Sequence, residues 1–440
     1  MNYKNIILEM KKTYYQFSTE LENHIYLYYN TFNNKFMLLN EKKHDLFELD
    51  CQEIEKKDKN FYKELIDNQF IVDNSFDGYE IANYVAKQKM FDSSMYQIVV
   101  NTTLDCNLNC WYCYENRISG SKLKEDVVEA IKKNIELEYS CLPYKTLKFS
   151  FFGGEPFIEF EKIKDLLSFT KSFCKENKIE LIADFTTNAT LITSDHIEFL
   201  KDFECHFQIT LDGDRIVHNK IKIDKENPSD TYQKVINVLR LINSEIPQRW
   251  LAVRINFDNR TLEKIDEIIS DIDFLDRKTC YVILKKVWQI PTDKVDVPLL
   301  HETIQKFFDK KFLLDYYIMP KGCICFAQRH RETLFNYDGK IFKCTTISDF
   351  DDANSLGKLE LETGNIQWDL DKIALWMKDQ QPENCRQCKW YPACFGICSK
   401  QILAHPNEKM CTFDAMNMNT QEYLIYSFKY HLLQNELHMM

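Results

Sequence analysis

The sequence contains no run of about 18 uncharged apolar residues, the length that a membrane-spanning helix needs. Residues 1–12 also lack the apolar core of a secretion signal. Basic residues are in the minority, with 56 Lys and Arg against 67 Asp and Glu, and the net charge is -11. This balance argues against a protein that holds its partner through the phosphates of a nucleic acid. We therefore expect a cytoplasmic protein that binds neither membrane nor nucleic acid.

The chain has 440 residues, of which 45% are hydrophobic, so we expect two or three units with a sizeable core. Sixteen cysteines are present without a secretion signal. Because a reducing cytosol disfavours disulfides, this number favours metal binding or catalysis. Most of the cysteines fall into two groups, at 106–113 and 325–411, and Cys323 lies beside the second group. The others are expected to be small buried hydrophobic residues, namely Cys51, Cys141, Cys174, Cys205 and Cys280.

A C-x3-C-x2-C triplet, Cys106, Cys110 and Cys113, follows a short apolar strand expected at 97–101. Three thiolates on one loop can hold three irons of a [4Fe-4S] cluster and leave the fourth iron without a protein ligand. Zinc is the alternative, but a closed zinc site needs a fourth ligand nearby. The closest other cysteine is Cys141, and no histidine lies close downstream. The triplet therefore favours a cluster with one open iron.

Residues 1–90 are expected to form a separate small α+β unit. The pattern predicts two strands around an Asn33-Asn34 turn, then two short helices and an extended piece, at 26–29, 35–39, 41–49, 60–68 and 70–72. This arrangement resembles the leader-recognition element that is fused to many enzymes acting on ribosomally made peptides. The resemblance implies that an exposed strand edge pairs with the leader segment of a substrate. The alternative is a structural cap on the next domain.

From about 95 to 315 the chain alternates between strands and amphipathic helices. Strands are predicted at 97–101, 147–152, 181–186, 206–211, 251–256 and 281–287, and helices at 125–138, 160–176, 194–200 and 232–244. This alternation predicts an α/β fold with a parallel sheet covered by helices. Catalytic groups then belong at the carboxyl ends of the strands. Unusual residues do follow these ends: the triplet, Gly153-Gly154-Glu155-Pro156, Thr187-Asn188 and Asp212-Gly213.

These four motifs, in this order, resemble the radical S-adenosylmethionine (SAM) superfamily over residues 95–290. The resemblance implies a partial (β/α)6 TIM-like barrel. It also implies that Cys106, Cys110 and Cys113 bind a [4Fe-4S] cluster whose open iron chelates SAM. An electron donor such as flavodoxin or ferredoxin would reduce the cluster. Cleavage of SAM would then yield a 5′-deoxyadenosyl radical that abstracts hydrogen from a substrate.

The resemblance also implies contacts to SAM. Gly153, Gly154, Glu155 and Pro156 match the turn that receives the methionine ammonium. Asn188 and Thr210 match polar positions near the ribose and the carboxylate. Tyr112 matches a ring beside cluster or adenine, although a plain core aromatic is an equal alternative.

Two basic residues extend this set of predicted cofactor-binding residues. Lys222 stands where related enzymes often have an arginine, which would grip a carboxylate with two parallel hydrogen bonds instead of one point charge. We predict that Lys222 contacts the cofactor carboxylate; a solvent-facing lysine is the alternative. Arg254, on the fifth strand, points into the same mouth if the barrel forms, and a structural ion pair is its alternative.

The second cysteine group resembles the SPASM extension, which holds two auxiliary [4Fe-4S] clusters, so three clusters are implied in all. A zinc ribbon is the alternative for its central cysteines. By resemblance, auxiliary cluster I takes Cys325, Cys344 and Cys398, with Cys323 as the only nearby candidate for a fourth ligand. If Cys323 is not a ligand, that cluster has an open iron. Auxiliary cluster II takes Cys385, Cys388, Cys394 and Cys411.

The predicted organisation is a leader-recognition unit at 1–90, a radical SAM core at 91–315, a SPASM domain at 316–415 and a helical tail at 416–440. We expect an enzyme that installs a cross-link, a thioether or an epimerised centre in a ribosomally made precursor peptide. An anaerobic sulfatase maturase, which makes formylglycine, is the first alternative. In that family an aspartate after the second cysteine of a C-x(n)-G-x4-C unit acts as base, whereas here Thr345 and Thr346 follow Cys344. A non-catalytic iron–sulfur scaffold or electron carrier is the second alternative.

Overall fold

The computed structural model describes residues 9–226, 229–287, 294–317, 324–378, 381–406 and 408–438. Contacts between residues divide the chain into two compact units. Unit 1 consists of Met1–Met90, Tyr317–Cys325 and Asp379–Lys429, and unit 2 of Phe91–Tyr316, Phe326–Lys378 and Tyr430–Met440. The segment expected to form a SPASM domain, 316–415, therefore contributes to both units.

Unit 2 is built on one 11-stranded sheet with the strand order β12-β11-β10-β9-β8-β7-β6-β13-β14-β15-β16. Its central strands are β6 (Met95–Thr103), β7 (Thr146–Gly153), β8 (Glu180–Thr187), β9 (Glu204–Leu211), β10 (Arg249–Phe257) and β11 (Cys280–Lys286). These six are parallel, so the predicted strands and the α/β fold with a parallel sheet are confirmed. At the two ends, β12 (Leu313–Asp315) and β13 (Glu332–Phe335) extend the parallel set.

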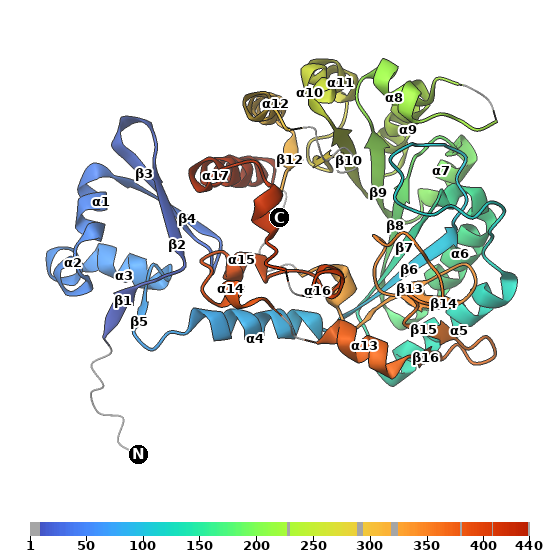
Figure 1. Ribbon diagram of the computed structural model, residues 1–440, viewed down its shortest axis with the longest axis horizontal. Coiled ribbons are helices and arrows are strands. Elements are labelled where there is room, and N and C mark those ends of the chain that lie inside the picture. Colours follow the sequence, from blue (N-terminus) through green and yellow to red (C-terminus); the bar gives the residue numbers. More distant parts are fainter. Residues whose placement is uncertain are drawn as a thin grey trace. The chain divides into compact units, whose positions relative to one another are not determined.

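Helices connect these strands and lie around them in Figure 1. They are α5 (Glu125–Cys141), α6 (Phe160–Asn177), α7 (Ser194–Leu200), α8 (Arg215–Ile221), α9 (Thr231–Glu245), α10 (Asn259–Glu263), α11 (Ile265–Ile272) and α12 (Val297–Asp309). The four predicted helices correspond to α5, α6, α7 and α9. Each of α8 and α10 begins with an aspartate, Asp214 or Asp258, that accepts a backbone N–H of the first turn.

The two faces of the parallel sheet differ in polarity. The helix-covered face carries fully buried apolar side chains, among them Phe149, Phe185, Phe207, Val253 and Leu284. Side chains alternate between the faces along a strand, so the next residues of the same strands point the other way. That opposite face carries polar residues such as Ser150, Asp184, Gln208, Thr210 and Arg254. A closed barrel fills its interior with branched apolar residues. In this protein the corresponding face of the sheet, the one opposite the helices, is polar and lines a cavity.

The remaining part of unit 2 is a small antiparallel extension of the sheet. It contains the 3-10 helix η3 (Phe326–Gln328), β14 (Lys340–Phe342), β15 (Gly357–Leu359), β16 (Ile366–Trp368) and α13 (Leu370–Met377). Trp376 fixes α13, because its indole N–H donates to the carbonyl of Ala327 at 2.8 Å. At the opposite edge, Leu433 and Leu437 of α17 (Thr420–Leu437) pack on Leu313 of β12.

Unit 1 contains the three-stranded antiparallel sheet β2-β3-β4, formed by β2 (Gln16–Glu20), β3 (Ile25–Asn30) and β4 (Lys35–Asn40). The predicted hairpin is β3 and β4, joined by a turn in which Asn34 has φ 55°. One face of the sheet, with Tyr28 and Leu39, packs on α1 (Glu41–Glu48), α2 (Cys51–Lys57) and α3 (Lys59–Asp67). The other face, with Leu27 and Tyr29, packs on Leu424 of α17.

The rest of unit 1 brings the N-terminal region together with the second cysteine group. Its elements are β1 (Met10–Lys12), β5 (Ile71–Asp73), the 3-10 helix η1 (Glu22–His24), α4 (Gly78–Met90), α14 (Glu383–Arg386), α15 (Tyr391–Cys394), α16 (Ser399–Ala404) and the 3-10 helix η4 (Thr412–Ala415). Ala82 and Ala86 of α4 share a core with Cys385, Tyr391 and Phe395. In addition, Thr31 donates its hydroxyl to the carbonyl of Lys389 at 2.6 Å.

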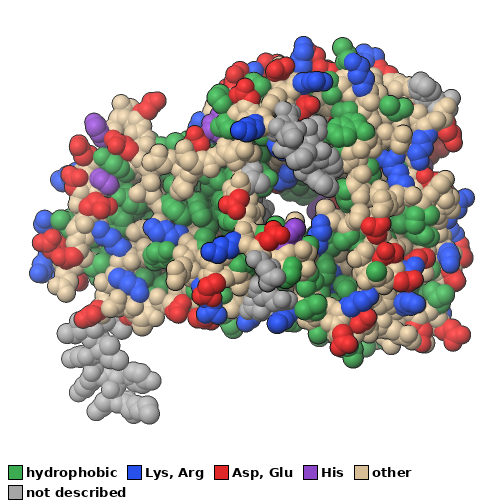
Figure 2. All heavy atoms as spheres, in the orientation of Figure 1, with side chains coloured by type: hydrophobic (Ala, Val, Ile, Leu, Met, Phe, Trp, Pro, Cys, Tyr) green, Lys and Arg blue, Asp and Glu red, His purple; other side chains and the backbone are tan. Residues whose placement is uncertain are grey.

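The visible face of the molecule in Figure 2 mixes acidic and basic side chains without one large area of a single sign. Among the residues that the structure describes, no helix has the length and apolar character that crossing a membrane requires. Of the single cysteines expected to be buried, Cys174, Cys205 and Cys280 are buried and Cys51 is half-buried. The expectation is wrong for Cys141, which is exposed because it is the last residue of α5.

Candidate functional site

The cysteine triplet lies on the loop that follows β6, at the carboxyl edge of the parallel sheet. Cys106 is buried, Cys110 is half-buried and Cys113 is exposed, and all three line one cavity of about 690 Å³. The first turn of the loop is fixed by Asp105, whose carboxylate accepts the backbone N–H groups of Cys106 and Gly120, each at 2.8 Å. The three thiols therefore reach the same space from one short segment.

Arg117 holds the second half of this loop. Its guanidinium donates to the carbonyl oxygen of Leu108 at 2.5 Å and to the side-chain oxygen of Asn109 at 3.2 Å. A fixed positive charge beside several thiols stabilises their ionised form. Arg117 therefore contributes both to the shape of the loop and to its positive charge.

The donor set fits an iron–sulfur cluster better than a zinc ion. Burial and the charge of Glu155 raise the pKa of the free Cys106 thiol to about 12, and a bound metal would hold the thiolate instead. Sulfurs on one zinc ion lie within about 4 Å of each other, given Zn–S bonds of about 2.3 Å. Among the described residues, the only three metal-capable groups with ligand atoms within 4.8 Å of one another are Glu125, Glu129 and Asp165. The triplet sulfurs are thus further apart than one zinc ion requires.

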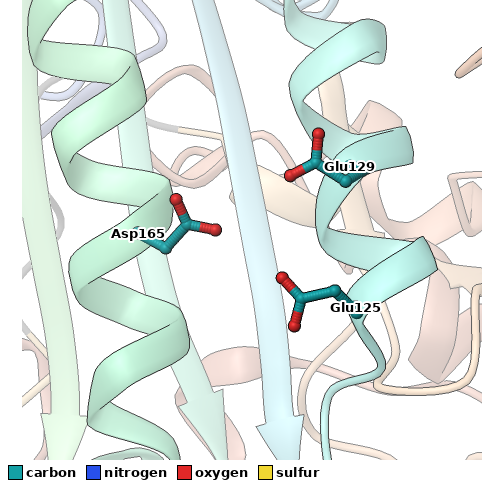
Figure 3. A group of neighbouring side chains, drawn as sticks. All are labelled: Glu125, Glu129 and Asp165. Carbon is teal, nitrogen blue, oxygen red and sulfur yellow. The ribbon is translucent and has the colours of Figure 1, made fainter.

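Those three carboxylates, shown in Figure 3, lie on α5 and α6 and are held by lysines. Lys132 lies 2.7 Å from Glu129 and 2.8 Å from Asp165, and Lys162 pairs with Glu125. The group is therefore an ion-pair network between two helices.

Two glycines at the end of β7 bring this strand against the triplet loop. Gly153 has φ 111°, and a Cβ there would collide with the carbonyl oxygen of Thr103. A Cβ on Gly154 would collide with the carbonyl of Asp105, while its own N–H donates to Thr103 at 3.0 Å. Both glycines line the cavity beside the thiols, so the loop after β7 and the cysteine loop form one wall.

Glu155 is completely buried behind this wall. Its carboxylate accepts the hydroxyl of Thr187 at 2.7 Å, the N–H of Asn188 at 2.8 Å and the N–H of Phe157 at 3.2 Å. Burial raises its pKa to about 7, against the effect of these three donors. Glu155 and Pro156 are not among the residues that line the cavity. The contact of Glu155 and Pro156 with the cofactor remains a prediction. In the structure, the hydrogen bonds of Glu155 join the ends of β7 and β8.

Asn188, at the end of β8, reaches the triplet directly. Its side-chain amide donates to Asn107 at 3.0 Å and approaches the sulfur of Cys106 at 3.7 Å. Asn188 and Thr210 both line the cavity. The structure thus brings the predicted polar positions on β8 and β9 to the same space as the thiols.

Tyr112 and Lys222 meet at one buried carboxylate, Asp212. The Tyr112 hydroxyl donates to Asp212, and the Lys222 ammonium lies 3.3 Å from Asp212 and 5.7 Å from the centre of the Tyr112 ring. Asn256 adds a hydrogen bond to Asp212 at 2.9 Å. Burial alone would lower the pKa of Lys222, but the Asp212 carboxylate raises it well above its ordinary value. Lys222 is therefore buried and does not face solvent, and Tyr112 lines the cavity; the contact of either residue with the cofactor stays a prediction.

Arg254 also lines the cavity, beside Thr210 in the register of β9 and β10. Its Nε donates to the side-chain oxygen of Asn256 at 3.1 Å. Within the described part of the chain, no carboxylate lies within ion-pair distance of its guanidinium. The alternative of a structural ion pair therefore does not hold there.

Cavity residues outside the predicted cofactor-binding set come from several segments. Glu115 is buried at the cavity wall, and burial raises its pKa to about 7. Asn256 joins Arg254 to Asp212, and Thr345 and Thr346 line the cavity from the segment after β14. The sequence feature that could have identified Asn256 is its position at the end of a predicted strand.

The cysteines assigned to auxiliary cluster II all belong to unit 1 and are close neighbours. Burial raises the pKa of Cys385 to about 12, and the charges of Cys394, Cys388 and Cys411 add to the rise. Four thiols that influence one another in this way form a compact donor set for a metal centre. Within the described part of the chain, however, no three of these sulfur atoms lie within 4.8 Å of one another.

The cysteines assigned to auxiliary cluster I do not all belong to one unit. Cys325 and Cys398 belong to unit 1, whereas Cys344 belongs to unit 2, and Cys323 lies outside the described residues. This ligand set therefore remains a prediction.

Comparison with known proteins finds similarity over part of the chain. Residues 100–272 match the model of the Radical SAM superfamily. A cysteine-type anaerobic sulfatase-maturating enzyme of Clostridium novyi (strain NT) is 24% identical over 343 residues, which are 70% of this chain and 88% of that protein. The radical SAM cyclopropyl synthase TigE of Paramaledivibacter caminithermalis is 25% identical over 260 residues, 54% of this chain and 52% of that protein.

A solved structure with the same fold is native anSMEcpe with bound AdoMet and Cp18Cys peptide. It has a TM-score of 0.56 and 17% sequence identity, and the match covers 78% of this chain and 99% of that one. The similarity supports the fold derived above, a parallel sheet whose carboxyl edge carries the cysteine loop.

Proposed function

The chain carries a radical SAM domain, the domain of enzymes that carry out radical-based modification, and from this premise we propose that it matures a ribosomally made precursor peptide. The modification is a cross-link, a thioether or an epimerised centre. The observation that carries the proposal is the cavity itself: the three thiols, the Gly153-Gly154 turn and a polar sheet face line one space of about 690 Å³. This space, referred to below as the chamber, accommodates a cofactor together with a substrate side chain.

Within the chamber we assign cluster binding to Cys106, Cys110 and Cys113. We assign SAM binding to the wall formed by Tyr112, Gly153, Gly154, Asn188 and Thr210, with Glu155 and Pro156 completing the turn behind it. When bound, the reduced cluster and SAM supply a carbon radical that abstracts hydrogen from an unactivated C–H bond. The residues of the chain bind and orient the reactants: Asn188 positions the triplet loop, and Glu155 fixes Asn188 through its backbone N–H.

We propose that the second cysteine group holds two auxiliary [4Fe-4S] clusters of the SPASM type, three clusters in total. We propose that these clusters relay electrons between the chamber and a donor such as flavodoxin or ferredoxin. The mutual proximity of Cys385, Cys388, Cys394 and Cys411 supports auxiliary cluster II. We place the reaction in the cytoplasm, where thiolates and reduced clusters persist.

The leader segment of the precursor peptide is proposed to bind the β2-β3-β4 sheet of unit 1. Both faces of that sheet are covered, by helices α1–α3 and by α17, so its edges remain for a partner. Within the described chain, β4 pairs only with β3. Leu38 on β4 is 50% exposed, a side chain that an added strand would cover.

An anaerobic sulfatase maturase is the second candidate, because the Clostridium novyi relative covers most of this chain. One feature argues against it. That family has an aspartate base after the cysteine that corresponds to Cys344, whereas this chain places Thr345 and Thr346 there, with both residues on the chamber wall. A threonine hydroxyl does not supply the carboxylate that acts as base in that family.

The test uses the anaerobically reconstituted protein with dithionite and SAM. We expect 5′-deoxyadenosine, and none from a triple variant with Ala at Cys106, Cys110 and Cys113. The protein is then co-expressed with each short reading frame beside its gene, and the peptide is examined by mass spectrometry. A modified peptide supports the proposal; formylglycine in a sulfatase-derived peptide would support the second candidate. Absence of 5′-deoxyadenosine under all conditions would leave a non-catalytic iron–sulfur protein.

A further inference from the structure

The cations of the chamber differ in how they are compensated. Lys148 lies 3.4 Å from Asp184, and Lys222 lies 3.3 Å from Asp212. Arg254 has no such carboxylate among the described residues. The Nε of Arg254 donates a hydrogen bond to Asn256. The two terminal NH2 groups of the guanidinium can therefore donate to a ligand. A half-buried guanidinium with two unassigned donor groups is suited to one planar, bidentate acceptor.

A second cation reinforces this position. Lys285 on β11 is in register with Asn256 on β10, next to Arg254. Burial lowers the pKa of Lys285, Asp315 counteracts this, and the positive charge of Arg254 adds to the lowering. The two cations therefore repel one another, and an anion bound beside them would relieve that repulsion.

Arg254 and Lys285 lie on other strands than the Gly153-Gly154 turn and Asn188, whereas Thr210 and Tyr112 of the proposed SAM wall lie close to Arg254 and its partner Asn256. The triplet loop, the Gly153-Gly154 turn and Asn188 follow β6, β7 and β8, whereas Arg254 and Lys285 lie on β10 and β11. We propose that Arg254, supported by Lys285, binds a carboxylate of the substrate within the chamber. The substrate class is thus a peptide with an acidic side chain close to the modified residue. This inference rests on the proposed function, because it requires a peptide substrate.

One other carboxylate has access to the chamber, the methionine carboxylate of SAM, and Thr210 lies next to Arg254 in the sheet. The first arm of the test separates the two sources. Binding of SAM and of decarboxylated SAM is measured by equilibrium dialysis with reconstituted wild type, Arg254→Gln and the control Arg260→Gln, an exposed arginine on α10. We expect SAM affinities within about twofold for all three. A loss of about tenfold or more in Arg254→Gln, for SAM but not for decarboxylated SAM, would assign Arg254 to the cofactor and overturn the proposal.

The second arm identifies the substrate group. A randomised peptide library displayed on its encoding mRNA is selected on the SAM-loaded wild type, Arg254→Gln, Arg254→Lys and Arg254→Glu. We expect Asp or Glu to be enriched several-fold with the wild type, less with Arg254→Lys and not at all with Arg254→Gln. With Arg254→Glu the preference should change to Lys or Arg. Iron content and melting temperature of each variant show that a lost preference does not come from misfolding.

The possible results separate this inference from the proposed function. Enriched peptides without an acidic preference, or the same preference in Arg254→Glu, would overturn the carboxylate subsite and leave the peptide maturase intact. If no peptide is enriched even with the wild type, the peptide substrate itself fails, and the subsite fails with it. An acidic preference that depends on Arg254 supports both.

Discussion

Asp212 and Lys222 form an ion pair of 3.3 Å in which the side chains are only 1% and 8% exposed. Tyr112 and Asn256 complete the hydrogen bonds of the carboxylate. The pair joins the end of β9 to the residue after α8, and it holds the ring next to Cys113. A buried pair of this kind gives little net stability, but removing one partner leaves a charge without compensation.

We therefore predict that Lys222→Gln lowers the free energy of unfolding by about 3–5 kcal/mol, since the Asp212 charge is left buried. The double variant Asp212→Asn/Lys222→Gln should recover part of this loss. The control is Lys220→Gln, which removes an exposed charge two residues away. Urea denaturation of the metal-free proteins measures the effect, and equal midpoints for Lys222→Gln and Lys220→Gln would contradict it.

Cys110→Ala should abolish formation of 5′-deoxyadenosine and lower the iron content by up to about four atoms per chain, because the triplet then offers two thiolates for a [4Fe-4S] cluster. Cys141→Ala is the matched control, since Cys141 is exposed at the end of α5. Iron analysis and chromatography of the nucleoside products test the prediction. Full cleavage activity in Cys110→Ala would remove it from the ligand set.

Cys394→Ala should also lower the iron content while SAM cleavage without peptide turnover persists. The physical reason is that Cys394 belongs to the thiol group of unit 1 and not to the triplet that we propose to hold the SAM-binding cluster. The ratio of 5′-deoxyadenosine to modified peptide should therefore rise. Iron content equal to that of Cys141→Ala would count against auxiliary cluster II.

Glu155 gives a pH dependence. Burial raises its pKa from an ordinary 4.5 to about 7. Between these values the folded protein keeps a proton that the unfolded chain has released, so this group's contribution to stability is lost as the pH rises from about 4.5 to 7. Glu155→Gln has no such titration. The stability advantage of the metal-free wild type over Glu155→Gln should thus shrink between pH 5 and pH 8, by up to about 3 kcal/mol.

Denaturation with urea at both pH values measures this difference. The amide of the glutamine variant meets the hydroxyl and N–H donors that the carboxylate accepted, so the variant should be the less stable protein at pH 5. A difference in stability that is the same at pH 5 and pH 8 would contradict the titration of Glu155.

Deleting residues 1–90 should destabilise the second cysteine group in addition to removing a binding element. Leu27 and Tyr29 pack on Leu424, and Ala82 packs in the core that contains Cys385. We expect the truncated protein to lose iron and to aggregate. Leu38→Lys changes only an exposed side chain of β4 and should keep its iron while it weakens binding of a leader peptide. Normal iron content after the deletion would show that the N-terminal region is a dispensable cap.

Much of the parallel sheet could be predicted from the sequence, because its strands are apolar runs followed by marked motifs. Other elements gave little signal. The strands β14, β15 and β16 have three residues each, too few for an alternating pattern, and α8 depends on the cap at Asp214. For the site, the residue types near the thiols were predictable. The partners of Lys222 and Arg254 were not, because hydrogen bonds between distant strands leave no local pattern.

The two-unit division was also beyond the sequence patterns. The contact between Leu27 and Leu424 joins opposite ends of the chain, and neither residue differs from an ordinary core leucine in its local surroundings. Periodicity along a segment predicts that a face is buried, but it does not identify the segment that buries it.

Unit 1 takes its residues from the beginning, from the middle and from near the end of the chain. During synthesis the amino-terminal hairpin therefore leaves the ribosome long before Leu424, which covers one of its faces, has been translated. A domain that lacks part of its core at that stage exposes apolar surface and is prone to aggregate. We therefore expect the nascent chain to need protection from aggregation until Leu424 has been translated.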